Sequence, residues 1–188
     1  MTDVSLQKRI HALNHKWWHD KYGNRLDRNK GELICLFHSE QSEATEGVMT
    51  DAMDDKLPHR RMDEVEMADT RIRILDYAEG IGHRLDPAGI TVHPNARFYF
   101  NPTNVGTGAR LAQHAIIHLH ISKAMEAERK GRADDVPGWL NGALHLIALY
   151  CWLNGYDLDA ATEEKLAFNT TRVDHTHEAR ARADGKKW

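Results

Sequence analysis

The stretch ELICLFHSEQSEA, residues 32–44, sets the expectation for the whole chain. At about 100° per residue, four apolar side chains share one face of a helix: Leu33, Leu36, Phe37 and Ala44. Glu40 falls in the middle of this apolar stripe, and Glu43 lies at its edge. An acid that replaces a core residue is unfavourable unless it is paired or binds a metal. The segment therefore predicts a helix that packs on a core and also takes part in a site.

A second segment, residues 62–81, repeats the pattern. Its apolar stripe consists of Val65, Ala68, Ile72 and Leu75. Asp69 and Asp76 border this stripe, and Glu66 and Arg73 lie on the same flank. Glu66 and Asp69 are three residues apart, like the two glutamates of the first segment, so each pair projects from one ridge of its helix. If the two helices pack antiparallel, four carboxylates converge on one place.

Four close carboxylates repel one another unless cations lie among them. Oxygen ligands of this kind suit Mg²⁺ or Mn²⁺, whereas zinc prefers His and Cys. The alternative is a solvated acidic face with ordinary ion pairs to Lys56, Arg71 and Arg73, which is the commoner arrangement for any single acid. Because the spacing occurs twice, each time within an apolar stripe, the pattern favours a metal site.

Helical periodicity dominates the rest of the chain as well. The spacing predicts helices over residues 6–22, 30–47 (ending at Gly47), 62–81, 108–130, 139–154 and about 157–173, the last capped by Asp157 or Asp159. We expect a long loop at 86–107 and a charged, mobile tail at 174–188. The prediction is one all-α domain over residues 1–188, a bundle of five to six helices with its active site between the second and third.

Composition and net charge limit which functional classes the protein can belong to. With 188 residues, of which 41% are hydrophobic and 28% charged, the chain has enough apolar material for one core. A formal net charge of −3 argues against a protein that coats nucleic acid, so we expect no nucleic-acid partner. A small anionic ligand is still compatible with this charge, because a bound divalent metal inverts the local field.

The cysteines and the apolar segments indicate the compartment. Cys35 and Cys151 each lie in an apolar run, which favours reduced, buried thiols. The N-terminal residues contain no apolar signal region, and we expect a cytoplasmic protein. Residues 139–153 are apolar almost all round, but they are short for a membrane span and include Asn141 and His145. We therefore expect a buried core helix and no membrane partner.

Two surfaces predict self-association. The helix over 62–81 has a weaker second apolar patch opposite the first, formed by Met67, Ile74 and Ala78. The helix over 139–154 is apolar on nearly every side. Together they predict a buried bundle and a homo-oligomer, either a dimer or a tetramer.

At the two acidic segments the chain resembles the MazG-like superfamily of all-α nucleotide pyrophosphohydrolases. The signature of that family is Glu-x-x-Glu on one helix and Glu-x-x-Asp on the next, which here are Glu40-x-x-Glu43 and Glu66-x-x-Asp69. A third match is Lys165-x-x-x-Asn169-x-x-Arg172. The resemblance is dense over residues 30–82 and recurs at 164–172. Small phage and bacterial members are the most similar in layout, and they include the phage MazZ branch, which supplies purine deoxynucleotides for 2-aminoadenine DNA.

The resemblance implies a Mg²⁺-dependent enzyme that converts a (d)NTP and water to a (d)NMP and diphosphate. It implies two or more Mg²⁺ ions, for which Mn²⁺ can substitute, held by Glu40, Glu43, Glu66 and Asp69. Glu40 is our choice for the group that orients or deprotonates the attacking water. Arg73 and Asp76 are expected to support the metal ligands, although these two could equally pair with each other.

The phosphates and the base need further residues. Lys165, Asn169 and Arg172 fall on one helix face, where a cation, an amide and a guanidinium suit phosphate oxygens. The first helix offers Asn14 for a base edge and Trp17 and Trp18 for stacking. Adjacent tryptophans point about 100° apart, so at most one of them stacks on the base while the other packs elsewhere.

Other interpretations stay open at this point. A purine substrate such as dGTP or GTP is the favoured one, while removal of non-standard nucleotides and a non-catalytic, nucleotide-binding helical module are the alternatives. A ferritin-like di-iron bundle would need Glu-x-x-His, which occurs nowhere in the sequence. His114 and His118 are spaced for zinc, but without the Glu of a His-Glu-x-x-His motif they are expected to be structural.

Overall fold

All the regular secondary structure in the described part of the chain is helical, which confirms the all-α class. The computed structural model describes residues 3–86, 89–172, 176 and 179. Its elements are α1 (Asp3–Leu13), α2 (His15–Trp18), α3 (Lys30–Thr50), α4 (Met62–Ile81), α5 (Ala96–Tyr99), α6 (Thr107–Arg129), a 3₁₀ turn η1 (Ala133–Asp135), α7 (Val136–Leu153) and α8 (Leu158–Thr171). The tail predicted at 174–188 lies outside the described residues apart from 176 and 179.

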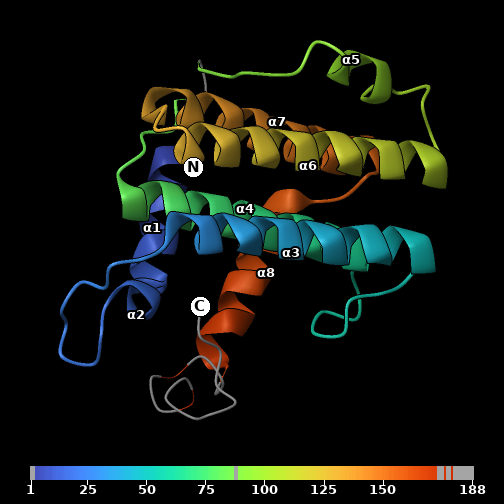
Figure 1. Ribbon diagram of the computed structural model, residues 1–188. Coiled ribbons are helices and arrows are strands. Elements are labelled where there is room, and N and C mark those ends of the chain that lie inside the picture. Colours follow the sequence, from blue (N-terminus) through green and yellow to red (C-terminus); the bar gives the residue numbers. More distant parts are fainter. Residues whose placement is uncertain (1–2, 87–88, 173–175, 177–178, 180–188) are drawn as a thin grey trace.

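Four long helices form two layers. Figure 1 shows α6 and α7 packed side by side above the antiparallel pair α3 and α4, with α1 and α8 against the other side of α4. Helix α4 therefore contacts α1, α3, α7 and α8. This central position explains why α4 has an apolar patch on two opposite sides and is buried along most of its length. The acids of its stripe consequently lie near the middle of the molecule.

The ends of α3 and α4 follow local chemistry. Asn29 caps α3, because its side-chain oxygen accepts the backbone N–H groups of Gly31 at 2.9 Å and Glu32 at 3.2 Å. The predicted stop at Gly47 is wrong, since α3 continues to Thr50. Gly47 instead allows close helix packing: a Cβ there would lie 2.9 Å from the Met62 Cβ atom at the start of α4.

The first predicted helix, over 6–22, is also wrong in its extent. It is divided at Asn14 into α1 and the single turn α2, and the chain leaves helical structure after Trp18. The Asp20 carboxylate then accepts the backbone N–H groups of Tyr22 and Asn24, which stabilises a turn where the pattern predicted helix. The break allows the Trp18 ring to pack into the core, where it is 1% exposed.

A buried polar group ties three helices together away from this region. The Asp63 carboxylate on α4 is fully buried and accepts from the Tyr156 hydroxyl at 3.2 Å and from Arg110 and Tyr150. Arg110 also donates to the Tyr150 hydroxyl at 3.1 Å. An unpaired acid here would be strongly unfavourable, so this network accounts for Asp63 without a ligand.

Helix α7 is only partly the buried helix that its composition predicted. By length and composition alone, one segment of the described chain, Ala133–Leu153, could span a membrane, and half of its apolar window is buried inside the protein. Leu140 and Ile147 lie in the core, whereas Trp152 is 68% exposed. Core helices pass the same test, so this segment is weak evidence for a membrane.

The two cysteines also differ in burial. Cys151 of α7 is buried as predicted, but Cys35 is exposed. The prediction for Cys35 is wrong because its neighbours Leu33, Ile34 and Phe37 are the residues that α3 buries, which leaves Cys35 on the outer side of the helix.

Contact between Trp18 and Gly80 gives a direct test of this packing. A Cβ at Gly80 would lie 2.2 Å from the Trp18 ring, which has no room to move. We expect Gly80→Ala to lower the free energy of unfolding by about 1–3 kcal/mol, although alanine favours a helix. The matched control is Gly108→Ala in α6, where a Cβ would meet no atom of the described residues within 4 Å, so no loss is expected. Urea unfolding of both variants measures this, and equal effects would contradict the packing.

Candidate functional site

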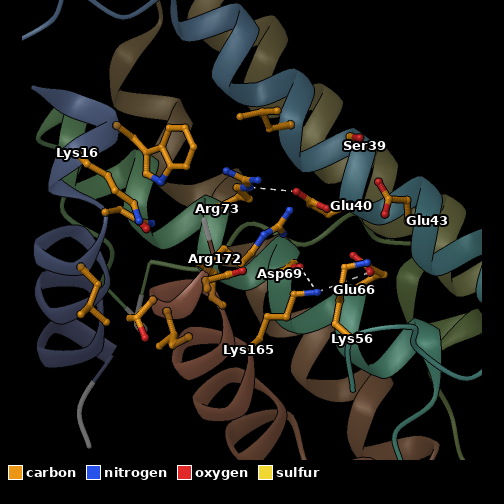
Figure 2. Close-up of a pocket in the computed structure, with 18 of the residues that line it drawn as sticks. Lys16, Ser39, Glu40, Glu43, Lys56, Glu66, Asp69, Arg73, Lys165 and Arg172 are labelled. Atoms are coloured by element: carbon orange, nitrogen blue, oxygen red, sulfur yellow. Dashed lines mark hydrogen bonds and ion pairs between the residues drawn. The ribbon is translucent and has the colours of Figure 1, made fainter. Parts of the chain in front are cut away.

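A cavity of about 580 Å³ lies where α3, α4, α8, the 51–61 loop and the α1–α2 junction meet. Figure 2 shows the charged side chains that surround it. Among the described residues, most of the predicted site residues line it: Asn14, Trp17, Glu40, Glu43, Glu66, Asp69, Arg73, Lys165, Asn169 and Arg172. Its lining does not include Trp18 or Asp76. The volume is within the usual range for small-molecule sites.

Three acids form a cluster on one wall. Glu40 and Glu43 of α3 and Glu66 of α4 each offer a carboxylate oxygen, and these oxygens lie within 4.8 Å of one another. Glu43 is exposed, Glu40 is half-buried and Glu66 is only 5% exposed. The Oε2 atom of Glu66 is buried and has no hydrogen-bond partner within the described part of the chain. A buried carboxylate oxygen without a partner calls for an unseen ligand, and a hard divalent cation fits this donor set.

The fourth predicted acid, Asp69, has a different partner. Its Oδ2 atom lies 2.8 Å from the Lys165 Nζ atom, which is also 4.0 Å from Glu66 Oε1. Lys165 projects from α8 and is only 4% exposed. The residue expected to bind phosphate is therefore paired with two of the acids expected to bind metal, as the dashed line in Figure 2 indicates for Asp69.

Arg73 and Asp76 were expected to support the acids, but they face different ways. The Arg73 Nε–H donates to Glu40 Oε1 at 3.0 Å, which ties the carboxylate on α3 to α4. Asp76 instead accepts from the Trp18 indole N–H at 2.9 Å and lies 2.7 Å from the His11 Nδ1 atom. Trp18 and Asp76 therefore bond to each other in the core and do not reach the cavity.

Burial changes the protonation of the acids. Burial, reinforced by the charge of Asp69, raises the pKa of Glu66 to about 9, although Lys165 opposes the shift. Burial likewise raises the pKa of Asp69, again against the effect of Lys165. Burial alone would lower the pKa of Lys165, but Asp69 and Glu66 outweigh it and raise that pKa. At neutral pH the metal-free site therefore holds a proton on Glu66, which a divalent cation would have to displace.

The cavity has two chemically different ends. Asn169 joins Lys165 on α8 at the charged end, and its Oδ1 atom is buried with no partner among the residues described. Arg172 also lines the cavity, but the prediction that it lies on the same helix face is wrong, because α8 ends at Thr171 and Arg172 is extended. Asn14 and Trp17 lie at the α1–α2 junction, with apolar walls from Leu13 and Leu36 nearby. Figure 2 shows Lys16, the neighbour of Trp17, across the cavity from Glu43 and Glu66. A ligand with one anionic and one aromatic part suits this arrangement.

Lys56 is a cavity residue that the sequence pattern did not assign to the site. It lies in the loop between α3 and α4, lines the cavity and contacts Asp55. The buried Asp54 carboxylate accepts the backbone N–H groups of Lys56 at 2.9 Å and Leu57 at 2.6 Å, which holds the loop in place. The available signal was its position in the loop that joins the two helices that carry the acids.

The two histidines spaced for zinc bond to separate partners. The Nδ1 atom of His118 lies 2.8 Å from that of His38, whereas the Nδ1 atom of His114 lies 3.0 Å from the Thr45 hydroxyl. Burial lowers the pKa of both His114 and His118 to about 4, so they are neutral at physiological pH. They line the contact between α3 and α6 and take no part in the acidic cluster.

Comparison of the chain with protein-family models, with curated proteins and with solved structures gives no significant match in any of the three. The resemblance to the MazG-like superfamily therefore rests on the motifs quoted above and stays a prediction.

The raised pKa of Glu66 gives a prediction for the metal-free protein. Between its unfolded pKa of 4.5 and its folded pKa of about 9, the folded state binds more protons than the unfolded state, so stability falls as pH rises. Glu66→Gln has no proton to lose. We expect it to raise the free energy of unfolding in EDTA by about 1–3 kcal/mol at pH 8, with a smaller gain at pH 5.

Urea unfolding at the two pH values measures this difference. Glu46→Gln, at an exposed glutamate of α3, is the control and should change little at either pH. A Glu66→Gln effect that is the same at both pH values would contradict the buried, protonated carboxyl.

Proposed function

We propose that this protein is a Mg²⁺-dependent nucleoside triphosphate pyrophosphohydrolase, which converts a (d)NTP and water to a (d)NMP and diphosphate. One observation carries the proposal: a single cavity brings together the acidic cluster, the cation and amide face of α8, and the Asn14–Trp17 junction. A triphosphate has the matching parts, namely metal-binding phosphates, further phosphate oxygens and an aromatic base.

The acids supply the metal-binding part. Glu40, Glu43, Glu66 and Asp69 would hold two or more Mg²⁺ ions, because they are oxygen ligands and one buried oxygen of Glu66 has no other partner in the described residues. Bound Mg²⁺, or Mn²⁺ in its place, would offset the negative charge of the phosphates and act as a Lewis acid at the α-phosphate. Without such charge, a triphosphate would be repelled by these acids.

Glu40 is placed to handle the proton of the attacking water. The Arg73 Nε–H donates to the Glu40 Oε1 atom at 3.0 Å, and the Glu40 side chain lines the cavity. In the proposed reaction the water oxygen bonds to the α-phosphorus, Glu40 accepts the water proton, and the bond from the α-phosphorus to the bridging oxygen breaks. Diphosphate leaves with the electron pair of that bond.

The remaining residues would position the substrate. Lys165, Asn169 and Arg172 would bind phosphate oxygens, with the Arg172 guanidinium able to bind two at once. Trp17 would stack on the base and Asn14 would hydrogen-bond to its edge. Trp18 is left out of this role, since its indole N–H is bonded to Asp76 in the core. We favour a purine such as dGTP or GTP on the strength of the phage-like layout alone.

Product analysis tests the reaction class. We expect the purified protein with Mg²⁺ to release diphosphate and a nucleoside monophosphate from at least one member of a panel of standard and modified triphosphates. EDTA should abolish release, and Mn²⁺ should restore it. Chromatography that separates diphosphate from phosphate reads the result. Inorganic phosphate as the primary product, or no product from any triphosphate, would overturn the proposal.

Two conservative variants test the assigned acids. Glu40→Gln and Asp69→Asn remove one charge each with little change in shape, and we expect kcat to fall by about 100- to 10,000-fold. Circular dichroism should show the same helix content as the wild type. The control is Glu46→Gln, which repeats the three-residue spacing from Glu43 but lies on the exposed side of α3 and should keep full activity. Normal turnover in Glu40→Gln or Asp69→Asn would remove that residue from the site.

A further inference from the structure

Lys165 is a buried cation, and the ion pairs that the described residues form with its ammonium are with acids of α4. Its Nζ atom lies 2.8 Å from Asp69 and 4.0 Å from Glu66, and the residue is 4% exposed. Figure 2 shows the side chain reaching from α8 toward these two acids of α4. An ammonium without water needs an anionic partner, and buried carboxylates need a cation. In the metal-free protein the Lys165 ammonium and the Asp69 carboxylate therefore satisfy each other, whereas Glu66 lies further from the ammonium and holds a proton at neutral pH.

The Lys165 ammonium satisfies the acids only in part, so the site can still bind a cation of higher charge. One ammonium faces two acids, and it is at hydrogen-bond distance from only one of them. The Glu66 Oε2 atom remains buried with no partner in the part of the chain that the structure describes, and the other two clustered acids are Glu40, which is tied to Arg73, and the exposed Glu43. A divalent cation would bring twice the charge to the same oxygens and would repel the ammonium.

We propose that Lys165 is a built-in counter-cation, which competes with divalent metal for Asp69 and Glu66 and is released toward the phosphate-binding face of α8 when metal binds. The second half of this proposal rests on the proposed function, since it gives the released ammonium a phosphate to bind. Asn169 lies one turn further along α8 and also lines the cavity, so the released ammonium stays beside the other phosphate-binding groups.

If Lys165 competes with the metal, its removal has a different effect from the removal of a lysine that only binds phosphate. Removal of Lys165 should strengthen the binding of metal alone, because its competitor is gone, and should weaken the binding of a triphosphate to the metal-loaded protein. Opposite effects on the two ligands would not follow from general damage to the site. Linkage also requires that metal and triphosphate promote the binding of each other.

The experiment measures Mn²⁺ binding to the full chain without nucleotide, by electron paramagnetic resonance of the free ion. The variants are Lys165→Met, Lys165→Gln and Lys165→Arg, and the matched control is Lys56→Met, which removes a cation of the same cavity that contacts Asp55 instead of the cluster. We expect Lys165→Met and Lys165→Gln to bind Mn²⁺ about tenfold more tightly than the wild type. Lys165→Arg keeps a positive charge beside Asp69, and Lys56→Met leaves the ion pair between Lys165 and Asp69 intact. The Mn²⁺ affinity of both variants should therefore stay within about threefold of the wild type.

A second titration uses a nucleotide with a methylene bridge between its α and β phosphates, at saturating Mn²⁺. We expect Lys165→Met to bind it at least about tenfold more weakly than the wild type does. Circular dichroism checks that each variant is folded, and two neutral variants are included so that one folded variant suffices.

The outcomes separate this inference from the proposed function. Unchanged or weaker Mn²⁺ binding in both neutral variants overturns the counter-cation, even if the wild type releases diphosphate. An equal gain in Lys56→Met also overturns it, because the effect would then come from net charge alone. Tighter Mn²⁺ binding specific to the neutral Lys165 variants supports the counter-cation, even if the wild type cleaves no triphosphate.

Discussion

The burial of Glu66 and Asp69 in the central helix is the constraint on which the rest of the structure depends. A buried acid is tolerated when it is protonated, as Glu66 is at neutral pH, or when positive charge lies beside it, and Lys165 brings that charge from α8 to Asp69. The same requirement fixes α8 against α4, where two more ion pairs flank it: Arg60 with Glu164 at 2.8 Å and Arg71 with Asp159 at 2.6 Å. The position of α8 in turn closes the cavity opposite α3. The position of α8 and the charge balance of the site are therefore linked through Lys165.

The fold was predictable from periodicity where a helix packs along its whole length. The bounds of α4 match the predicted 62–81 because an uninterrupted apolar stripe and the terminal Gly82 both indicate them. Prediction failed where a distant contact decides the local structure. The segment 6–22 is helical in pattern, but the chain breaks at Asn14 and places Trp18 against Gly80, more than sixty residues away. Gly47 looks like a helix stop in sequence and is in fact a point of close contact between two helices.

The candidate site was likewise predictable only as far as helix periodicity groups side chains on one face. Spacing along a helix says which face a side chain occupies, so it grouped the four acids and, separately, Lys165 and Asn169 of α8. Arg172 reaches the same cavity from the residue that follows the helix. Spacing does not say which partner that face meets. The hydrogen bond between Trp18 and Asp76 joins two helices far apart in sequence, and so does the pairing of Lys165 with Asp69. Neither follows from a local pattern, and each changes the role that the sequence suggested.

The most direct measurement is anomalous diffraction from a crystal of this protein soaked with Mn²⁺. The account predicts manganese among the carboxylates of Glu40, Glu43, Glu66 and Asp69, with the Lys165 ammonium moved away from Asp69. Manganese bound elsewhere, for example at the His38–His118 pair, or none at all beside four carboxylates turned to solvent, would contradict it.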